Sequence, residues 1–190
     1  MKNFSGKNIL WVVFGLFIAA IIWAVLGYNS LVGLRETVDK QTSNVETQLQ
    51  RRADLIPNLV NTVKGYTSHE SEILNTLSEA RSKLAGSGNL SDKMTANSEI
   101  SDAVSRLLVV VENYPDLKAD KQFTALMDEL SGTENRITVA RNDYNVAVQS
   151  YNQSIKRFPS NIIAGMFGFT NAEYFEASEA SKSVPTVSFS

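Results

Sequence analysis

The chain of 190 residues contains no cysteine and a single histidine, His69. Without cysteine, the chain cannot form a disulfide, a thiolate nucleophile or a zinc site with thiolate ligands. His69 precedes Glu70 but lacks the second histidine of an HExxH zinc motif, and the segment from Thr67 to Glu70 fits a helix-capping box. A GxSxG motif and a glycine-rich phosphate loop are also absent. We therefore predict a non-enzymatic protein that holds no metal and no cofactor.

Charges of the two signs nearly cancel, and neither is concentrated in one region. The sequence has 18 lysines and arginines against 20 aspartates and glutamates, a net charge of -2. A nucleic-acid-binding protein needs a clustered basic face, which this distribution does not supply. We expect no nucleic-acid partner.

One long apolar run lies near the N-terminus. The residues from Ile9 to Leu26 include no charge, and a run of 18 or more apolar residues predicts a transmembrane helix. The run is longer than the apolar part of a signal peptide, so we expect a retained anchor rather than a cleaved leader. Trp11 and Trp23 lie near its two ends, where interfacial aromatic residues belong. Residues 1–27 are thus predicted to form the N-terminus and its anchor.

The orientation of this anchor depends on few charges. Lys2 and Lys7 precede the apolar run without any acidic residue, which favours a cytoplasmic N-terminus and an outward-facing remainder of the chain. Arg35 follows the run on the other side and weakens this preference.

The rest of the chain has a helical pattern. Proline is scarce, with four residues, and no alternation typical of strands persists. A first helix is expected from about residue 30 to 64, with a kink near Ala53 caused by Pro57. Gly65 is expected to end it and to separate it from a second helix. Its apolar positions recur at helical spacing: Leu31, Leu34, Val38, Val45, Leu49, Leu59 and Val63.

Three further helices are predicted, over residues 68–85, 91–113 and 116–157. A turn at 86–89 separates the first two, and Tyr114 with Pro115 ends the third helix of the chain. The last helix repeats every seven residues, as in the coiled-coil packing of a left-handed bundle. This row consists of Phe123, Leu130, Ile137, Tyr144, Tyr151 and Phe158.

These patterns predict an all-α protein: a single N-terminal transmembrane helix followed by an antiparallel up-down four-helix bundle over residues 28–158. The number of helices then returns the chain to the membrane surface after Phe158. This result requires the break at Gly65. If the first and second helices were one continuous helix, the segment after Phe158 would lie at the end of the bundle far from the membrane. Residues 159–180 are expected to form an apolar segment and a short helix over 171–179, and residues 181–190 a flexible tail.

The apolar segment is too short and too rich in glycine to span a bilayer. It has two interpretations: a contact with lipid or a protein partner, or a cover for the open end of the bundle core. Lys156 and Arg157 precede it and would face lipid headgroups. The predicted contact residues are Ile162, Ile163, Met166, Phe167 and Phe169.

Charged residues fall on or beside the apolar seams: Arg52 lies on the seam of the first helix, and Glu134 and Arg141 flank the seam of the last. Arg52 shares the heptad position of Leu31 and Leu59, and Glu134 and Arg141 share a row with Val148. At about 1.5 Å per residue, Arg52 stands about 36 Å beyond Tyr28 and Glu134 about 37 Å beyond Pro159. These matched heights predict an Arg52–Glu134 ion pair. Its predicted neighbours are Arg51, Asp54 and Arg141.

This polar cluster has three possible roles. It can fix helix register, as buried polar groups do elsewhere. It can form a ligand or partner site, or it can be a solvated surface. The sequence leaves these alternatives open.

Several stretches together resemble the LemA family of bacterial membrane-anchored proteins, and they cover nearly the whole chain. The most specific is RRADLIPNLV, residues 51–60. The matching stretches are Tyr28–Val32, Gln48–Val60, Thr62–Tyr66, His69–Glu70, Ala80–Arg81, Tyr114–Leu117, Thr133–Ile137, Ala140–Asn145, Tyr151–Asn152, Phe158–Ser160, Gly168–Phe169 and Tyr174–Glu176.

The resemblance implies one N-terminal anchor in the cytoplasmic membrane, an antiparallel helical bundle and no defined activity. A magnetosome-associated relative suggests membrane organisation by analogy. The family has also been drawn with its N-terminus outside, which opposes the orientation that Lys2 and Lys7 favour. We expect an interaction or scaffolding protein whose partners are the lipid bilayer and either another protein or further copies of itself. The alternative is an extracytoplasmic sensor that binds a small molecule between helices through Arg52 or Arg141.

Overall fold

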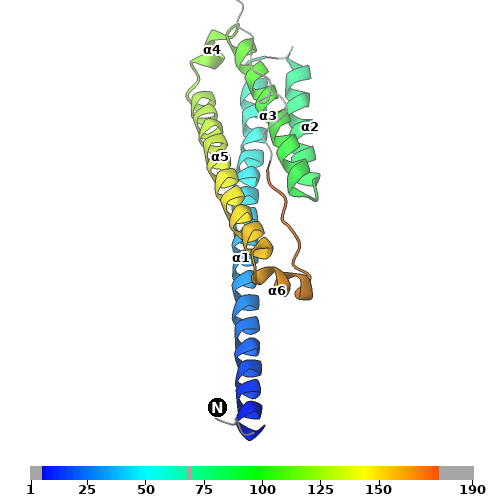
Figure 1. Ribbon diagram of the computed structural model, residues 1–190. Coiled ribbons are helices and arrows are strands. Elements are labelled where there is room, and N and C mark those ends of the chain that lie inside the picture. The colour runs from blue at the N-terminus through cyan, green and yellow to red at the C-terminus, as the bar shows by residue number, and fades with distance from the viewer. Residues whose placement is uncertain (1–5, 68–69, 176–190) are drawn as a thin grey trace, which may run out of the picture. The chain divides into compact units, whose positions relative to one another are not determined.

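The computed structural model describes residues 6–67 and 70–175, with side chains from Leu10 onward. All regular structure in these ranges is helical, which confirms the all-α class. The predictions for Lys2, for Ser68 and His69 and for the tail lie outside the described residues. The helices are α1 (Gly6–Lys64), α2 (Ser71–Gly86), α3 (Leu90–Val111), α4 (Pro115–Lys118), α5 (Lys121–Lys156) and α6 (Ser160–Phe167) (Figure 1).

The apolar run forms the first part of α1. Among the described residues, α1 is the one helix long and apolar enough to cross a membrane. Its apolar side chains from Leu10 to Leu26 are almost all exposed, as expected for a segment whose surroundings are lipid. The helix continues through Tyr28 without a break, so the anchor and the predicted first helix of the bundle are one helix, with Pro57 inside it.

The chain divides into two compact units. In the described residues, the first unit contains residues 6–40 and Asn145–Tyr174, and the second contains Gln41–Tyr144 with Phe175. Both α1 and α5 contribute residues to each unit.

Side chains cap α3 and α5 but not α2, so the capping box predicted from Thr67 to Glu70 is wrong: Glu70 directly precedes α2 without a side-chain cap bond and accepts from the Tyr114 hydroxyl instead. The break after α1 is present: Lys64 is its last residue, and α2 begins at Ser71. Asn89 caps α3 by accepting a hydrogen bond from the Asp92 amide at 2.8 Å. The prediction of one helix from 116 to 157 is wrong at its start, because Asp120 caps a separate α5 by accepting from the Phe123 amide at 2.7 Å.

The heptad rows identify the core. The row of α1 that contains Arg52 is buried throughout, from Leu31 to Leu59. In α5 the row is buried from Phe123 to Tyr151, but Phe158 is 81% exposed. Burial does not extend to Phe158 because α5 ends at Lys156, and a residue beyond the helix no longer follows the helical repeat.

In the first unit, α6 packs against α1 where the apolar run ends (Figure 1). A Cβ atom added to Gly27 would lie 2.3 Å from Cδ1 of Ile163, so the two helices meet there at close range. The Tyr28 ring lies 4.8 Å from the Phe167 ring and 5.7 Å from the Phe169 ring, measured between centroids. The segment after Phe158 therefore lies against the end of the apolar run.

The chain beyond α6 is held by hydrogen bonds from α5. Gly168, in the left-handed conformation with φ 73°, ends α6. The Tyr151 hydroxyl donates to the Thr170 carbonyl at 2.9 Å. The Asn152 side chain donates to the Ala172 carbonyl at 2.8 Å and accepts from its amide at 2.9 Å. The helix predicted for 171–179 is wrong over 171–175, because these bonds hold the backbone in a non-helical path; the remaining residues lie outside the described part.

Candidate functional site

The Arg52 cluster, defined as Arg52, Asn97, Ser101 and Glu134, joins α1, α3 and α5. Arg52 is only 3% exposed. Its Nη1 donates to Asn97 Oδ1 at 2.7 Å and to Ser101 Oγ at 3.1 Å, and it forms an ion pair with Glu134 Oε2. The predicted Arg52–Glu134 ion pair is thus confirmed.

Burial and charge act in opposite directions on Arg52. Burial lowers the pKa of its guanidinium, and the charge of Glu134 partly offsets this. An arginine remains protonated at neutral pH even after such a shift. Because the Glu134 side chain is 41% exposed, one end of the pair reaches solvent while the other is enclosed. A buried cation of this kind requires its acceptors, and those of Arg52 come from α3 and α5.

The predicted neighbours of this pair are elsewhere. Arg51 is exposed and pairs with Glu129 at 2.7 Å. Asp54 is exposed and accepts a hydrogen bond from Gln50 at 2.8 Å. The guanidinium of Arg141 lies 5.9 Å from the centre of the Phe175 ring. These contacts leave Arg51 and Asp54 on the outer face of α1, so the five predicted residues do not form one site.

Two members of the cluster, Asn97 and Ser101, were missing from the sequence prediction. Asn97 is buried, and it precedes Val104 and Val111 at intervals of seven. Extending the α3 apolar row by one heptad would have placed Asn97 on the seam. Ser101 carries no such signal.

A separate cavity of about 340 Å³ lies between α1 and α5 and opens to solvent. Its volume is at the lower end of the range for small-molecule sites. Gln48 Oε1, one of its lining groups, is buried and has no hydrogen-bond partner among the described residues. The cavity contains no member of the Arg52 cluster. Its lining residues are Asn44, Gln48, Asn135, Arg136, Val139 and Ala140.

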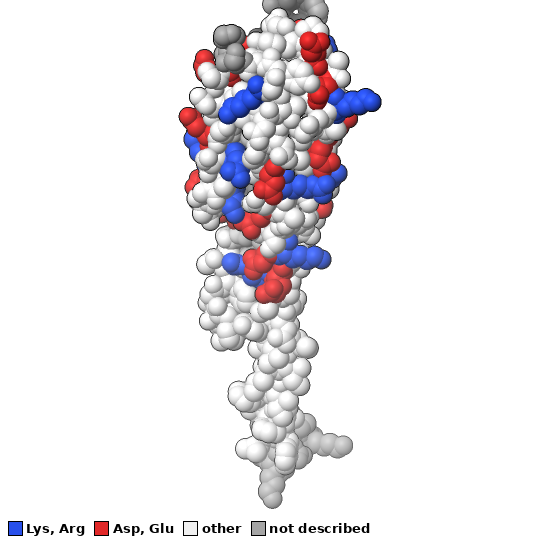
Figure 2. Space-filling view, turned by 180° about the vertical axis from the view of Figure 1, so that it is seen from behind, with Lys and Arg blue, Asp and Glu red and all other residues white. Residues whose placement is uncertain are grey.

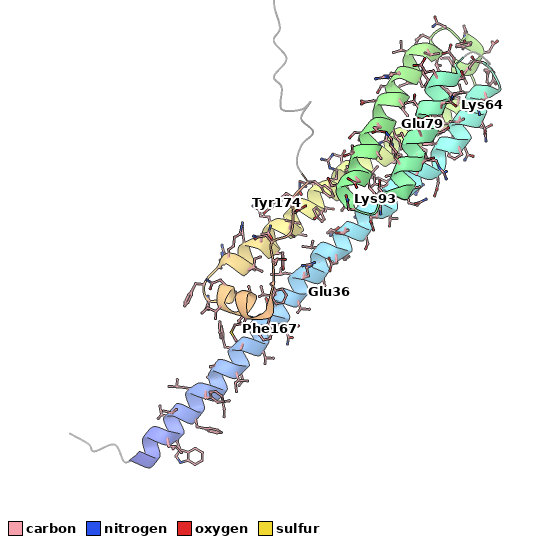
Figure 3. The ribbon with its side chains drawn as sticks, turned by 90° about the vertical axis from the view of Figure 1, so that its right-hand side faces the viewer. Glu36, Lys64, Glu79, Lys93, Phe167 and Tyr174 are labelled. Carbon is pink, nitrogen blue, oxygen red and sulfur yellow. The ribbon has the colours of Figure 1, made fainter. Side chains whose placement is uncertain are left out.

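The predicted contact segment in the first unit divides into two faces. Ile163 is 1% exposed and faces α1, whereas Met166 is 74% exposed. Phe169 is half-buried. We define the α6 apolar face as the exposed side chains of Phe158, Ile162, Met166 and Phe167. Figure 3 shows Phe167 on α6 beside α1.

Basic residues border this face. Lys156 and Arg157 are exposed and directly precede Phe158. On the side seen in Figure 2, the apolar part of α1 and the neighbouring α6 form a continuous surface without charged residues. In the described residues, no group of three acidic or histidine side chains could hold a metal ion.

Comparison with known proteins finds one family model and several similar proteins. The family model described as LemA family matches residues 41–189. Magnetosome protein MamQ 2 of Paramagnetospirillum magneticum is 30% identical, over 86% of this chain and 70% of the relative. Magnetosome protein MamQ of Magnetospirillum gryphiswaldense is 26% identical over the same shares. Protein LemA of Metamycoplasma hominis is 28% identical, over 80% of this chain and 69% of its own length.

Proposed function

The chain belongs to the LemA family, as its sequence motifs predict, and from this premise we propose that it is a non-enzymatic scaffolding protein anchored in the bacterial cytoplasmic membrane. Its helical part would hold a protein partner, or further copies of itself, at the membrane. The relatives named as magnetosome proteins support a role in cellular organisation rather than in catalysis.

The enclosure of Arg52 is the observation that carries this proposal. A ligand sensor built on Arg52 needs its guanidinium open to a cavity, whereas this guanidinium is buried and bonded to Asn97, Ser101 and Glu134. These three bonds support a role for Arg52 in holding the helices in register, although its Nε makes no hydrogen bond among the described residues. A helical module whose buried cation is already bonded within the protein is suited to docking through its surface.

We infer that α1, α2, α3 and α5 form an antiparallel up-down four-helix bundle. Burial of the heptad rows of α1 and α5 supports this arrangement. So does the Arg52 cluster, which links three of the four helices, and the pairing of α2 with α3 (Figure 1). The arrangement gives the scaffold a stiff body.

We further propose that the bundle faces outward from the cytoplasm, because Lys2 and Lys7 precede the anchor. The absence of cysteine makes a direct test possible. A Thr37→Cys variant, exposed on α1, should react with a membrane-impermeant maleimide in intact cells whose outer layers have been made permeable. Labelling that occurs only after the cells are lysed would contradict this proposal and show that the bundle faces the cytoplasm.

The scaffold proposal is tested by purifying the full-length protein from its native membrane in mild detergent and identifying retained proteins by quantitative mass spectrometry. The control carries residues 1–27 fused to an unrelated soluble domain. A stoichiometric partner retained by the full chain and absent from the control supports docking. A defined homo-oligomer supports self-assembly. Purification of a monomer without any retained protein would overturn the scaffold proposal.

The cavity between α1 and α5 favours one second candidate, a sensor that binds a small molecule between helices. Gln48 and Arg136 would then bind the polar groups of the ligand, instead of Arg52. A thermal-shift screen of the full chain against small polar metabolites tests it, with a Gln48→Leu variant as the control. A hit whose stabilisation disappears in Gln48→Leu would support sensing.

A further inference from the structure

We propose that the α6 apolar face rests in the lipid headgroup region of the bilayer beside the anchor, so that the chain contacts the membrane at two adjoining places. This inference rests on the proposed membrane anchoring but does not depend on any protein partner. Its members are Phe158, Ile162, Met166 and Phe167.

The position of α6 along the anchor is the first argument. The apolar run of α1 ends at Leu26, and α6 packs against the next two residues, Gly27 and Tyr28. One residue of helix rises by about 1.5 Å, so Ile163 meets α1 at the level where the hydrocarbon layer should end. Any bilayer that holds the run from Ile9 to Leu26 brings its interface to α6.

The composition of α6 is the second argument. No charged residue occurs between Phe158 and Ala172. The inner side of α6 is apolar because Ile163 and Ala164 are buried, and on its outer side Ile162 and Met166 are exposed one helical turn apart, beside the exposed Asn161. A surface helix in water normally has a polar outer side, so exposed apolar side chains of this size indicate apolar surroundings.

The bordering charges identify lipid as the occupant. Lys156 and Arg157 are exposed immediately before Phe158, and basic residues beside an apolar patch are attracted to anionic headgroups. The surface of α6 also continues into that of the apolar part of α1 without an intervening charged residue on the side seen in Figure 2. A protein partner on this face would have to enter the headgroup layer, whereas lipid is already there.

The test uses the full chain reconstituted at one molecule per nanodisc of mixed phosphatidylcholine and phosphatidylglycerol. Because the chain has no cysteine, Met166→Cys can carry a single environment-sensitive fluorophore, and Met166 is exposed enough for the change to leave folding intact. Lipids brominated on their acyl chains then report depth by quenching. An interfacial helix lies about 5–10 Å into the boundary, so we expect about half the quenching found for a residue within the anchor.

Two positions in the same unit calibrate this result. Leu16→Cys lies in the anchor and should be quenched most, and Thr37→Cys, nine residues beyond Tyr28, should be quenched least. Iodide in the aqueous phase should quench in the reverse order. Quenching at Met166 that equals that at Thr37, or shielding from iodide without quenching by lipid, would overturn the inference.

The outcome at Leu16 separates this inference from the proposed function. Loss of lipid quenching at Met166 alone refutes the lipid contact and leaves the anchor intact. Loss at both positions refutes the membrane anchoring itself. Replacing Lys156 and Arg157 by glutamine should reduce quenching at Met166 in these anionic nanodiscs and leave it unchanged at Leu16.

Discussion

Gly27 and Ile163 meet so closely that a Cβ atom on the glycine would lie 2.3 Å from Cδ1 of the isoleucine. A Gly27→Leu substitution should therefore push α6 away from α1, since Ile163 is buried and has little room to turn. Overpacking of this kind costs about 1–3 kcal/mol, so amide hydrogen exchange over residues 160–167 should accelerate about fivefold or more.

Gly33→Leu is the matched control, because Gly33 lies in the same helix and nothing is within 4 Å of a Cβ placed there. Both substitutions add the same side chain and the same gain in helix propensity. Equal exchange in the two variants would show that α6 does not depend on the surface at Gly27.

Removing Glu134 should destabilise the chain more than the loss of an ordinary surface charge. Glu134→Ala leaves the Arg52 cation buried with only Asn97 and Ser101 as acceptors. Loss of one partner of an enclosed pair costs about 3–5 kcal/mol, and water at the exposed end of Glu134 reduces this to about 2–3 kcal/mol. In a chain of this size, thermal unfolding in mild detergent should shift down by about 5–10 °C.

The control for this experiment is Glu112→Ala. Glu112 pairs with Lys118 at 2.7 Å, but both side chains are exposed. Its loss should change stability by less than about 1 kcal/mol. If the two variants melt at the same temperature, the Arg52 cluster does not fix the helices.

The Arg52–Glu134 pair could be predicted from sequence because two simple rules act together. The heptad placed Arg52 on the seam of its helix and Glu134 beside that of the other, and the constant helical rise placed them at one height. The same rules place Asn97 on its seam, two heptads before Val111. The heptad and the helical rise do not predict which side chains accept hydrogen bonds from Arg52, because this depends on side-chain rotamers and on the distance and angle between α3 and α1.

The sequence rules failed where helices end. The helix was predicted to end at residue 157, one residue beyond the observed end of α5, but the seven-residue repeat still counted Phe158, which is exposed. The cap at Asp120 was missed because an aspartate within an amphipathic pattern does not by itself mark a break. The residues after α6 were wrongly predicted as helix. Their backbone is held by hydrogen bonds to Tyr151 and Asn152, about 20 residues earlier in the chain, and a local sequence pattern does not reveal such bonds.

Asn152 should be required to hold the chain beyond α6. Its amide group bonds to both the amide and the carbonyl of Ala172, and it is buried. Asn152→Ala leaves these two backbone groups without their partner, a loss of about 1–3 kcal/mol. Hydrogen exchange over residues 170–175 should then become faster, whereas Asn142→Ala, an exposed position of the same helix, should leave it unchanged. Unchanged protection of Ala172 in the Asn152 variant would contradict this assignment.

The contribution of Asp120 should disappear in acid. The hydrogen bond from the Phe123 amide, together with that from the Tyr66 hydroxyl at 2.8 Å, lowers the pKa of the Asp120 carboxyl. A carboxyl whose pKa is lowered by folding contributes stability that is fully present above its unfolded pKa of about 3.9 and is lost as pH falls through the folded value. Wild type should therefore melt above Asp120→Asn at pH 7, and the two should converge once the pH is below the folded pKa.

Two further variants separate the charge of Asp120 from general acid unfolding. Tyr66→Phe removes the hydroxyl donor, so the pKa of Asp120 should rise toward its ordinary value and, in this background, the convergence should be complete at a higher pH. Asp128→Asn changes an exposed carboxylate on the same helix and should melt close to wild type at every pH. A gap between wild type and Asp120→Asn that stays constant from pH 7 into acid would mean that Asp120 acts through its shape alone, because an effect of its charge must vanish when the carboxyl is protonated.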